Sequence, residues 1–351
     1  MKKLFKSFSF SLFLFFTSIL CMCFFSCATT VNVQLTRPAK LDLNGAKTIA
    51  VLPIKPYAYY REYDAHSGTE LLINTFYQLF EINNPDEEAA IRTLRGEIEN
   101  GLAKSPYIKL INSDEVELAQ KKGYLNPADV YLTGEVSYFN IDDRVYEERK
   151  LVKAATETTA AEYIFEKHWI RDVDFRFRYQ IVDSSNNCVI SYSKIDCQAT
   201  SDNYERRSLL PSAYKLIESK IRYAAKSILK ELQPYVVTKS ISLLEAKTKD
   251  KALKERMKAA DELAGNSMLK KASEEFSNIY KETGLVEAGY NAAILQEALG
   301  NLSLAESMML EVYNNCPDSR VSKGLSDIRY EIEMANRLNK QIKSSDSEDD
   351  F

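Results

Sequence analysis

The chain has 351 residues, of which 45% are hydrophobic, 11% aromatic and 27% charged, and its formal net charge is −4. This length is enough for two domains. The mild acidity, with no basic stripe, excludes the usual nucleic-acid-binding classes, so no nucleic-acid partner is expected.

The amino terminus has the pattern of a bacterial export signal. Three early lysines precede an almost wholly apolar run from Phe8 to Phe25, which ends at Ser26 and Cys27. A positive start, an apolar core and a small residue before a break describe such a signal. Cys27 after Ser26 resembles the lipobox of bacterial lipoproteins, although two phenylalanines replace its usual residues. We expect a signal peptide over residues 1–26 and acylation of Cys27, with an uncleaved anchor helix as the alternative.

Three cysteines lie beyond the signal, at Cys188, Cys197 and Cys316. Cys188 and Cys197 fall in one predicted strand, so about 3.3 Å per residue separates them by roughly 30 Å. A disulfide needs α-carbons within about 7 Å, which excludes that pair. All three are expected to be buried, inert thiols.

Between residues 47 and 232 the chain interleaves strand and helix patterns. Apolar residues alternate in the strand segments and recur at helical spacing in the others. The expected strands are 47–54, 107–111, 130–141, 175–181 and 188–197, and the expected helices are 70–81, 87–102, one from Ser113, and 206–232. This order predicts an α+β or α/β domain over 47–235, a mixed sheet flanked by helices, after an extended leader at 27–46.

A tyrosine-rich loop follows the first strand and contains Tyr57, Tyr59 and Tyr60. Tyrosine offers a large contact area at small entropic cost. Loops at this position often bind ligands in α/β sheets. These rings are candidate partner-binding residues. The alternative is that they cover the sheet edge.

Three stretches carry a resemblance: "IAVLPI", "VYLTGEVSYF" and "FRFRYQIVDSSNNCVISY", the last followed by a long helix. Their order is similar to bacterial envelope lipoproteins of the curli-secretion-channel and penicillin-binding-protein-activator type, whose domain is related to the amino-terminal domain of the Tol-system propeller protein. The leader "TRPAKLDLNGAKTIAVLPI" with helical repeats also resembles an uncharacterised family of envelope lipoproteins. The resemblance implies a location in the cell envelope and no reaction.

The curli channel builds a membrane barrel from hairpins inserted in this domain, and residues 142–174 are the corresponding insertion. A lipid-facing hairpin needs about 10-residue segments of alternating polarity. Residues 147–150 are instead charged on both faces, and residues 154–161 are not apolar. We expect a soluble excursion. A component of an outer-membrane secretion or pore assembly is the alternative.

The carboxy-terminal part resembles tetratricopeptide repeats, in which small and apolar residues recur with a period near 34. The matching residues are Ala272, Phe276, Ile279, Ala292, Gly300, Ala305, Met309, Val312 and Pro317. We expect an all-α, tetratricopeptide-like domain over 236–342, closed by a capping helix over 321–342. An acidic disordered tail is expected at 343–351.

The repeat resemblance implies a peptide-binding groove. By the family's spacing, Glu287, Tyr290, Ile294 and Glu297 would face it. Two carboxylates there would suit a basic or neutral segment. The alternative is that the repeats only buttress the first domain.

No catalytic pattern emerges. His66 and His168 are the only histidines, and neither has a partner at metal-ligand spacing. No nucleophile elbow and no phosphate-binding glycine loop is present in the sequence. We therefore expect no enzymatic activity, no metal and no cofactor.

The expected role is a lipid-anchored scaffold, associated with the outer membrane, whose partners are the membrane and another envelope protein or peptide. The membrane face and the oligomeric state are left open.

Overall fold

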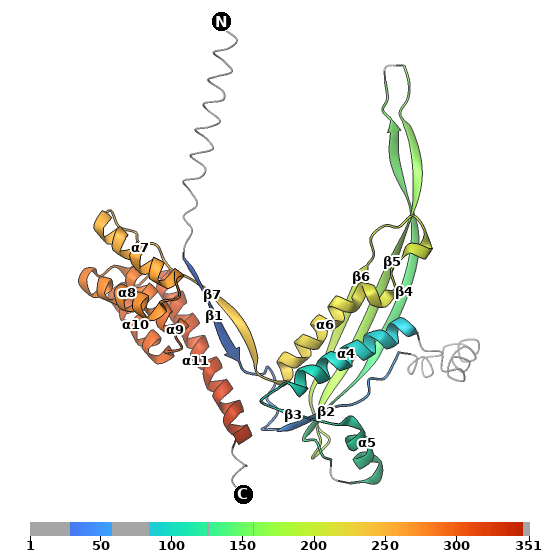
Figure 1. Ribbon diagram of the computed structural model, residues 1–351, viewed down its shortest axis with the longest axis horizontal. Helices are drawn as coiled ribbons and strands as arrows, with labels where there is room; N and C mark the ends of the chain where they lie inside the picture. Colours follow the sequence, from blue (N-terminus) through green and yellow to red (C-terminus); the bar gives the residue numbers. More distant parts are fainter. Residues whose placement is uncertain (1–28, 58–83, 125, 157, 347–351) are drawn as a thin grey trace. The chain divides into compact units, whose positions relative to one another are not determined.

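The computed structural model describes residues 29–57, 84–124, 126–156 and 158–346 (Figure 1). The chain divides into two compact units. The helical unit contains the chain up to Arg37 together with Val236–Arg337, and the α/β unit contains Pro38–Tyr235 and the chain from Leu338. A mixed sheet with helices, followed by a helical carboxy-terminal region, confirms the predicted fold class. The expected helix at 70–81 lies outside the described residues.

The α/β unit is built on a five-stranded sheet of order β3-β2-β4-β5-β6. Its strands are β2 (Thr48–Val51), β3 (Lys109–Ile111), β4 (Val130–Lys153), β5 (Glu162–Asp183) and β6 (Val189–Thr200). β2 runs parallel to β3 and β4, whereas β4, β5 and β6 are antiparallel. β4 and β5 are much longer than the predicted strands at 130–141 and 175–181.

Two helices, α4 (Pro85–Ala103) and α6 (Ala213–Leu232), lie side by side on one face of this sheet (Figure 1). α4 begins where the Asn84 side chain accepts a hydrogen bond from the Asp86 N–H, with proline in the first turn. Such caps satisfy amides that have no partner within the helix. The fully buried core between helices and sheet includes Leu94, Ile98, Ile217, Ile221, Ile228, Phe175 and Phe177.

α5 (Ser113–Lys122) packs on a separate, small core. Its Val116 contacts Ala50 of β2 and Ala128, both fully or almost fully buried. Neighbouring strand residues point to opposite faces, and Ile49 and Val51 belong to the larger core. α5 therefore covers the opposite face of the sheet near β2.

The start of α6 differs from the prediction of a helix from residue 206. Arg207–Leu209 form only a short 3-10 helix, η1, and Leu209 is 55% exposed. Pro211 lacks an N–H and clashes with a preceding helical turn, so an α-helix cannot run through it. The Ser212 side chain caps the new start by accepting a hydrogen bond from the Lys215 N–H.

In the helical unit, β1 (Thr30–Arg37) and β7 (Tyr235–Ser242) form a two-stranded sheet. The helices are α7 (Lys251–Gly265), α8 (Leu269–Thr283), α9 (Val286–Ala298), α10 (Leu302–Asn315) and α11 (Ser319–Asp346), the last up to Arg337 in this unit. The sequence predicted an extended leader in place of β1 and no strand at β7. Both strands form because Val31, Ile241 and Leu243 are buried against the helices.

The helices of this unit pack consecutively, α7 with α8 and α9 with α10. The apolar residues singled out by the repeat spacing are buried, namely Ala272, Phe276, Ile279, Ala292, Ala305, Met309 and Val312. α11 contributes Val321, Leu325 and Ile328 to the same core.

Candidate functional site: the hairpin arm

The most distinctive feature of the α/β unit is the extension of β4 and β5 beyond the rest of the sheet (Figure 1). β6 ends at Thr200, opposite Asp172, but β4 and β5 stay paired as far as Lys153 and Glu162. We call residues 143–153 and 162–171, with the described connecting residues 154–156 and 158–161, the hairpin arm. Within the excursion expected at 142–174, residues 143–153 and 162–171 therefore form a two-stranded ribbon.

Cross-strand contacts between side chains hold the arm together. The Glu147 carboxylate lies 3.7 Å from the Lys167 ammonium, and Lys150 donates to Glu166 at 3.0 Å. The Arg149 guanidinium lies 3.5 Å from the centroid of the Tyr163 ring. A two-stranded ribbon alone is only marginally stable in water. Each such pair contributes roughly 0.2–1 kcal/mol. The charged residues that made this segment unlike a membrane hairpin are the ones that stabilise it.

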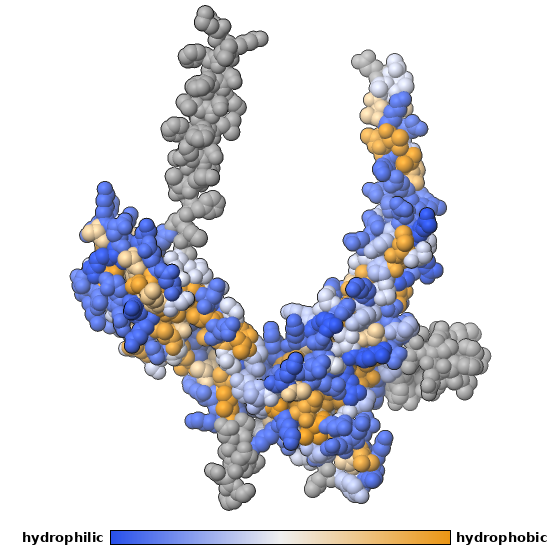
Figure 2. Space-filling model, viewed as in Figure 1, coloured by the Kyte–Doolittle hydropathy of each residue, from blue (hydrophilic) through white to orange (hydrophobic). Residues whose placement is uncertain are grey.

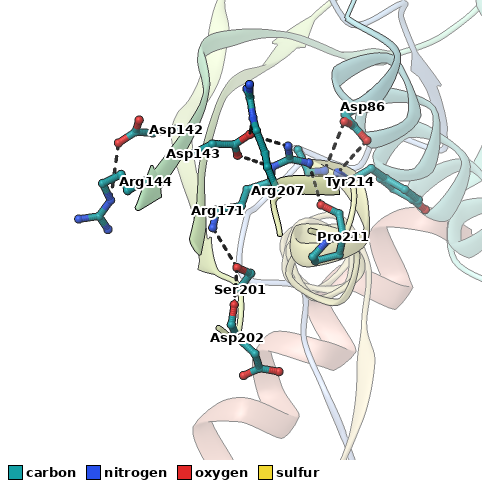
Figure 3. A network of polar contacts seen from close by, with 11 residues as sticks. Asp86, Asp142, Asp143, Arg144, Arg171, Ser201, Asp202, Arg207, Pro211 and Tyr214 are labelled. Atoms are coloured by element: carbon teal, nitrogen blue, oxygen red, sulfur yellow. Dashed lines mark hydrogen bonds and ion pairs between the residues drawn. The ribbon is translucent and has the colours of Figure 1, made fainter. Parts of the chain in front are cut away.

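A buried ion pair fixes the base of the arm (Figure 3). Arg171 donates to both oxygens of Asp143, at 2.6 Å from Nε and 2.9 Å from Nη2. It also donates to the Pro211 carbonyl at 2.8 Å, and Arg207 Nε donates to Asp143 at 2.9 Å. The Asp143 side chain is only 6% exposed. The hydrogen bonds from Arg171, followed by those from Arg207, lower the pKa of Asp143 to about 2.

The loop between β6 and α6 makes further contacts with the same base. Trp169 and Tyr204 exchange two backbone hydrogen bonds of 2.7 and 3.0 Å. Ser201 Oγ accepts from the Arg171 N–H at 2.9 Å and donates to the Asp202 carbonyl at 2.8 Å. We call this network, together with Asp143, Arg171 and Arg207, the base clamp. It ties the arm to the loop that leads into α6.

A carboxylate from α4 completes this region (Figure 3). Asp86 accepts from the backbone N–H groups of Ala213 and Tyr214, at 3.3 and 3.1 Å. These are amides of the first turn of α6, where a negative charge is favourable. The negative charge of Asp86 also helps to raise the pKa of Arg171. The starts of both helices and the base of the arm thus form one electrostatic unit.

The outer end of the arm exposes apolar side chains (Figure 2). We define the arm tip as Leu151, Val152, Tyr163, Ile164 and Phe165, all exposed, with Phe165 at 64%. Tyr163 and Phe165 alternate with Ile164 along β5, so apolar groups occur on both faces of the ribbon. Contiguous exposed apolar patches mark interaction sites, and an unpaired strand edge is a template for further pairing. The tip is therefore the candidate interaction surface of the arm, with exposed apolar side chains and unpaired strand edges.

The residues predicted to line the repeat groove lie instead inside the helical unit. Glu287, Ile294 and Glu297 are at most 4% exposed. Arg320 of α11 donates to Glu287 at 3.0 Å, and Lys239 of β7 pairs with Glu297. The expectation of an open groove at these positions is wrong, because α11 and β7 occupy it.

Tyr290, the fourth predicted groove residue, also contacts α11. A Cβ atom added at Gly324 would lie 2.7 Å from the Tyr290 ring. Burial raises the pKa of Tyr290. Its ring therefore packs within the helical unit.

Of the candidate tyrosines, the structure describes only Tyr57. Its ring lies edge-on to Tyr138 of β4, with centroids 5.8 Å apart, and packs against the main core. The Tyr57 ring therefore packs on β4, the central strand of the sheet. Tyr59, Tyr60 and the predicted lipidation site Cys27 lie outside the described residues.

The three described cysteines carry free thiols. Only Cys197 is buried, which raises its pKa to about 11. The prediction that all three are buried is wrong, because Cys188 and Cys316 are exposed. Within the described ranges no cluster of three or more His, Cys, Asp or Glu residues could hold a metal ion. No helix of that part of the chain is long and apolar enough to cross a membrane.

Sequence reasoning missed Asp143 and Arg171. The sequence does contain a signal for these two residues. Every second side chain of a strand faces the same side, so Asp143 falls on the inward side with Phe139 and Ile141, and Arg171 falls there with Val173. Opposite charges at inward positions of two paired strands indicate a buried ion pair. The register between the strands was needed to recognise it.

None of the protein-family models and none of the curated proteins matches this chain. Solved structures similar to it include the PelC dodecamer from Paraburkholderia phytofirmans, with 15% identity, 58% of this chain and 98% of that chain covered, and a TM-score of 0.24. Another is lipoprotein GNA1162 from Neisseria meningitidis, with 11% identity, coverages of 52% and 96%, and a TM-score of 0.22. The hypothetical protein CT253 from Chlamydia trachomatis has 13% identity, coverages of 52% and 95%, and a TM-score of 0.25. At these TM-scores the similarities carry no argument about function.

Proposed function

We propose that the protein is a lipid-anchored envelope protein, associated with the outer membrane, that acts as a non-enzymatic binding or assembly scaffold. One observation carries the proposal: the hairpin arm joins a base clamp, centred on the buried Asp143, to an exposed apolar tip. A fixed base reduces the conformational entropy lost when the tip binds. In this proposal the tip recognises another envelope protein or peptide.

The helical unit has a supporting role in this proposal. Its helices place the expected groove residues against α11 and β7, where Glu287 and Glu297 pair with cations of the same unit. The partner-binding surface is therefore assigned to the arm.

Site-specific photo-crosslinking in intact cells tests the arm. A crosslinking amino acid at Tyr163 should give discrete adducts, whereas the same group at Tyr223, which is 71% exposed on α6, should not. The adducts should disappear when Leu151 and Phe165 are both replaced by serine. Equal adducts from both positions, or adducts that survive the double replacement, would contradict the proposal.

The lipid anchor is tested separately. Cys27→Ala should abolish incorporation of labelled palmitate and release the protein from the membrane fraction. Cys23→Ala, which removes a cysteine from the apolar run, serves as the control and should leave both unchanged. Persistence of label and attachment in Cys27→Ala would refute the anchor.

A component of a secretion or pore assembly is the second candidate. The observation that favours it is the long β4–β5 ladder, which extends well beyond β6. The charged pairs of the arm oppose it, since a lipid-facing strand needs an apolar outer row. The acylated protein reconstituted in liposomes should give no conductance, and reproducible channels would favour this candidate instead.

A further inference from the structure

The helical unit contains a pocket of about 710 Å³ between α7 and the segment that follows β7. This volume lies within the usual range of ligand sites. The lining residues are Thr29, Leu243, Glu245, Ala246, Lys254, Met257, Lys258, Asp261, Glu262, Gly265 and Asn266. Both polar and apolar side chains are represented.

Two carboxylates from different elements meet at this pocket. Asp261 belongs to α7, and Glu245 follows β7. Burial, with a smaller contribution from the charge of Glu245, raises the pKa of Asp261 to about 6. Asp261 Oδ1 is buried and accepts no hydrogen bond. A buried acceptor without a donor is costly, so this region is suited to a ligand that supplies an N–H group.

Positive charge lines the same pocket. Lys254 and Lys258 lie four residues apart and thus on one face of α7. Neither forms an ion pair with a described residue. The pocket therefore offers carboxylates and ammonium groups to one ligand, which suits a molecule that carries both an ammonium and an anionic group.

The location of the pocket narrows the choice of ligand. Thr29 lines it, two residues after Cys27. Two residues span at most roughly 7 Å. The polar headgroup layer on each side of a bilayer is about 5–7 Å thick. If Cys27 carries the lipid, which is part of the proposed function, the Thr29 side of the pocket lies at the headgroup layer.

We infer that this pocket binds the phosphoethanolamine headgroup of a membrane lipid. The ammonium group lies at Asp261 and Glu245, and the phosphate lies at Lys254 and Lys258. A primary ammonium can donate hydrogen bonds to Asp261, whereas the quaternary ammonium of choline has no N–H. Lipid binding here would orient the helical unit on the membrane that holds the anchor.

Calorimetric titration of the full-length acylated protein in detergent tests the inference. The probe is glycerophosphoethanolamine, a diester whose phosphate charge is constant between pH 5 and 8, and the control is glycerophosphocholine. We expect saturable binding of the first and at least 10-fold weaker binding of the second. Equal affinities, or no binding of the ethanolamine compound, would overturn the inference.

Two variants locate the site. Asp261→Asn and Lys258→Gln should each weaken binding at least 10-fold, while Lys323→Gln on α11 should not. Asp261→Asn removes a buried charge without a hydrogen bond, so its melting temperature should not fall. Full binding by both pocket variants would contradict the assignment.

Binding should also weaken between pH 7 and pH 5. The pKa of Asp261 is about 6, so this carboxylate becomes neutral in that range; the other charged groups that line the pocket are Glu245, Glu262, Lys254 and Lys258. Affinity that is independent of pH would speak against Asp261 as the ammonium ligand.

Vesicles separate this inference from the anchor. The Cys27→Ala variant should bind the soluble probe normally, and should bind vesicles of phosphatidylethanolamine and phosphatidylcholine more tightly than vesicles of phosphatidylcholine alone. Probe binding without vesicle preference would assign the site to a free phosphoethanolamine compound and refute the lipid source. Acylation that persists in Cys27→Ala, with intact probe binding, would refute only the proposed anchor.

Discussion

At the residue scale, Asp143 is the group on which the base of the arm depends. It accepts hydrogen bonds from two arginines, and one of these, Arg171, also reaches the loop before α6. Hydrogen bonds to charged groups contribute roughly 1.5–3 kcal/mol each when the partner stays buried. Asp142, its neighbour in β4, faces solvent and lies 3.7 Å from Arg144.

Asp143→Asn should therefore lower the stability of the α/β unit by roughly 2 kcal/mol, because Arg171 loses its charged partner. Asp142→Asn is the matched control and should change the stability by less than about 0.5 kcal/mol. Urea unfolding followed by the fluorescence of Trp169, the chain's one tryptophan, measures both. Equal effects of the two variants would show that the base clamp contributes little.

The lowered pKa of Asp143 predicts that the free energy of unfolding depends on pH. The pKa of Asp143 is about 2 in the folded protein and about 3.9 in an unfolded chain. A lowered folded pKa adds stability that is present above pH 4 and lost as the pH falls toward 2. The difference in unfolding free energy between the original protein and Asp143→Asn should shrink over that range. A difference that stays constant down to pH 2 would contradict this assignment.

The sequence predicts which residues are buried where the strand alternation alone decides it. It does not predict side-chain environments that depend on an ion-pair partner elsewhere in the chain. The inward positions Leu132, Phe175 and Phe177 follow from alternation alone. The repeat spacing predicts that Glu287 and Glu297 face an open groove. In the structure Arg320 and Lys239 pair with these carboxylates and cover them. Such pairs join residues far apart in the chain, and one sequence does not show which residues meet.

At the element scale, β4 depends on a close approach at Gly134. A Cβ atom there would lie 2.5 Å from the Phe177 ring and 2.8 Å from the Arg178 carbonyl oxygen. Phe177 stacks on Tyr179, with centroids 5.6 Å apart, so the ring has little room to move. Gly96 in α4 presents the opposite case, since a Cβ atom there would meet nothing within 4 Å.

Gly134→Ala should destabilise the α/β unit by roughly 1–3 kcal/mol through overpacking. Gly96→Ala should stabilise it by roughly 0.5–1 kcal/mol, because alanine loses less entropy in a helix. Urea midpoints shifting in opposite directions would support the close approach in β4. A neutral Gly134→Ala would show that Phe177 can move aside.

The elements that sequence analysis missed have identifiable physical reasons. The arm carries charges on both faces, so it lacks the one-sided alternation of a half-buried strand, and only cross-strand pairing stabilises it. β1 and β7 are separated by about two hundred residues and pair only after the chain has folded. The start of α6 was predictable, because Pro211 excludes the preceding residues from the helix.

At the scale of the whole molecule, four elements that are distant in the sequence contribute to one ion network in the helical unit. Lys239 of β7 pairs with Glu297 of α9 and, at 2.9 Å, with Glu331 of α11. Arg37 of β1 also donates to Glu331, at 2.8 Å from Nη2. Burial raises the pKa of Glu297, whereas the hydrogen bonds from Arg37 and Lys239 leave that of Glu331 lowered despite its burial.

Lys239→Met should destabilise the helical unit by roughly 3 kcal/mol, because it leaves Glu297 buried without a counter-charge. Far-UV circular dichroism reports the helices of both units, of which α7–α11 are the larger share, while Trp169 reports the α/β unit alone. The circular dichroism midpoint in urea should fall and the fluorescence midpoint should stay. Lys323→Met, on the exposed side of α11, is the control. A joint shift of both signals would mean that the two units unfold as one.

The arm has a mechanical consequence. β5 runs as one strand from the arm tip to the core, where it pairs with β6 from Asp172 to Val182. Tension applied at the tip acts lengthwise along this strand, so it shears many hydrogen bonds of that ladder simultaneously instead of peeling them one by one. A pulling force on the arm tip is therefore distributed over the β5–β6 hydrogen bonds in the body of the sheet, and the hairpin arm resists being pulled out.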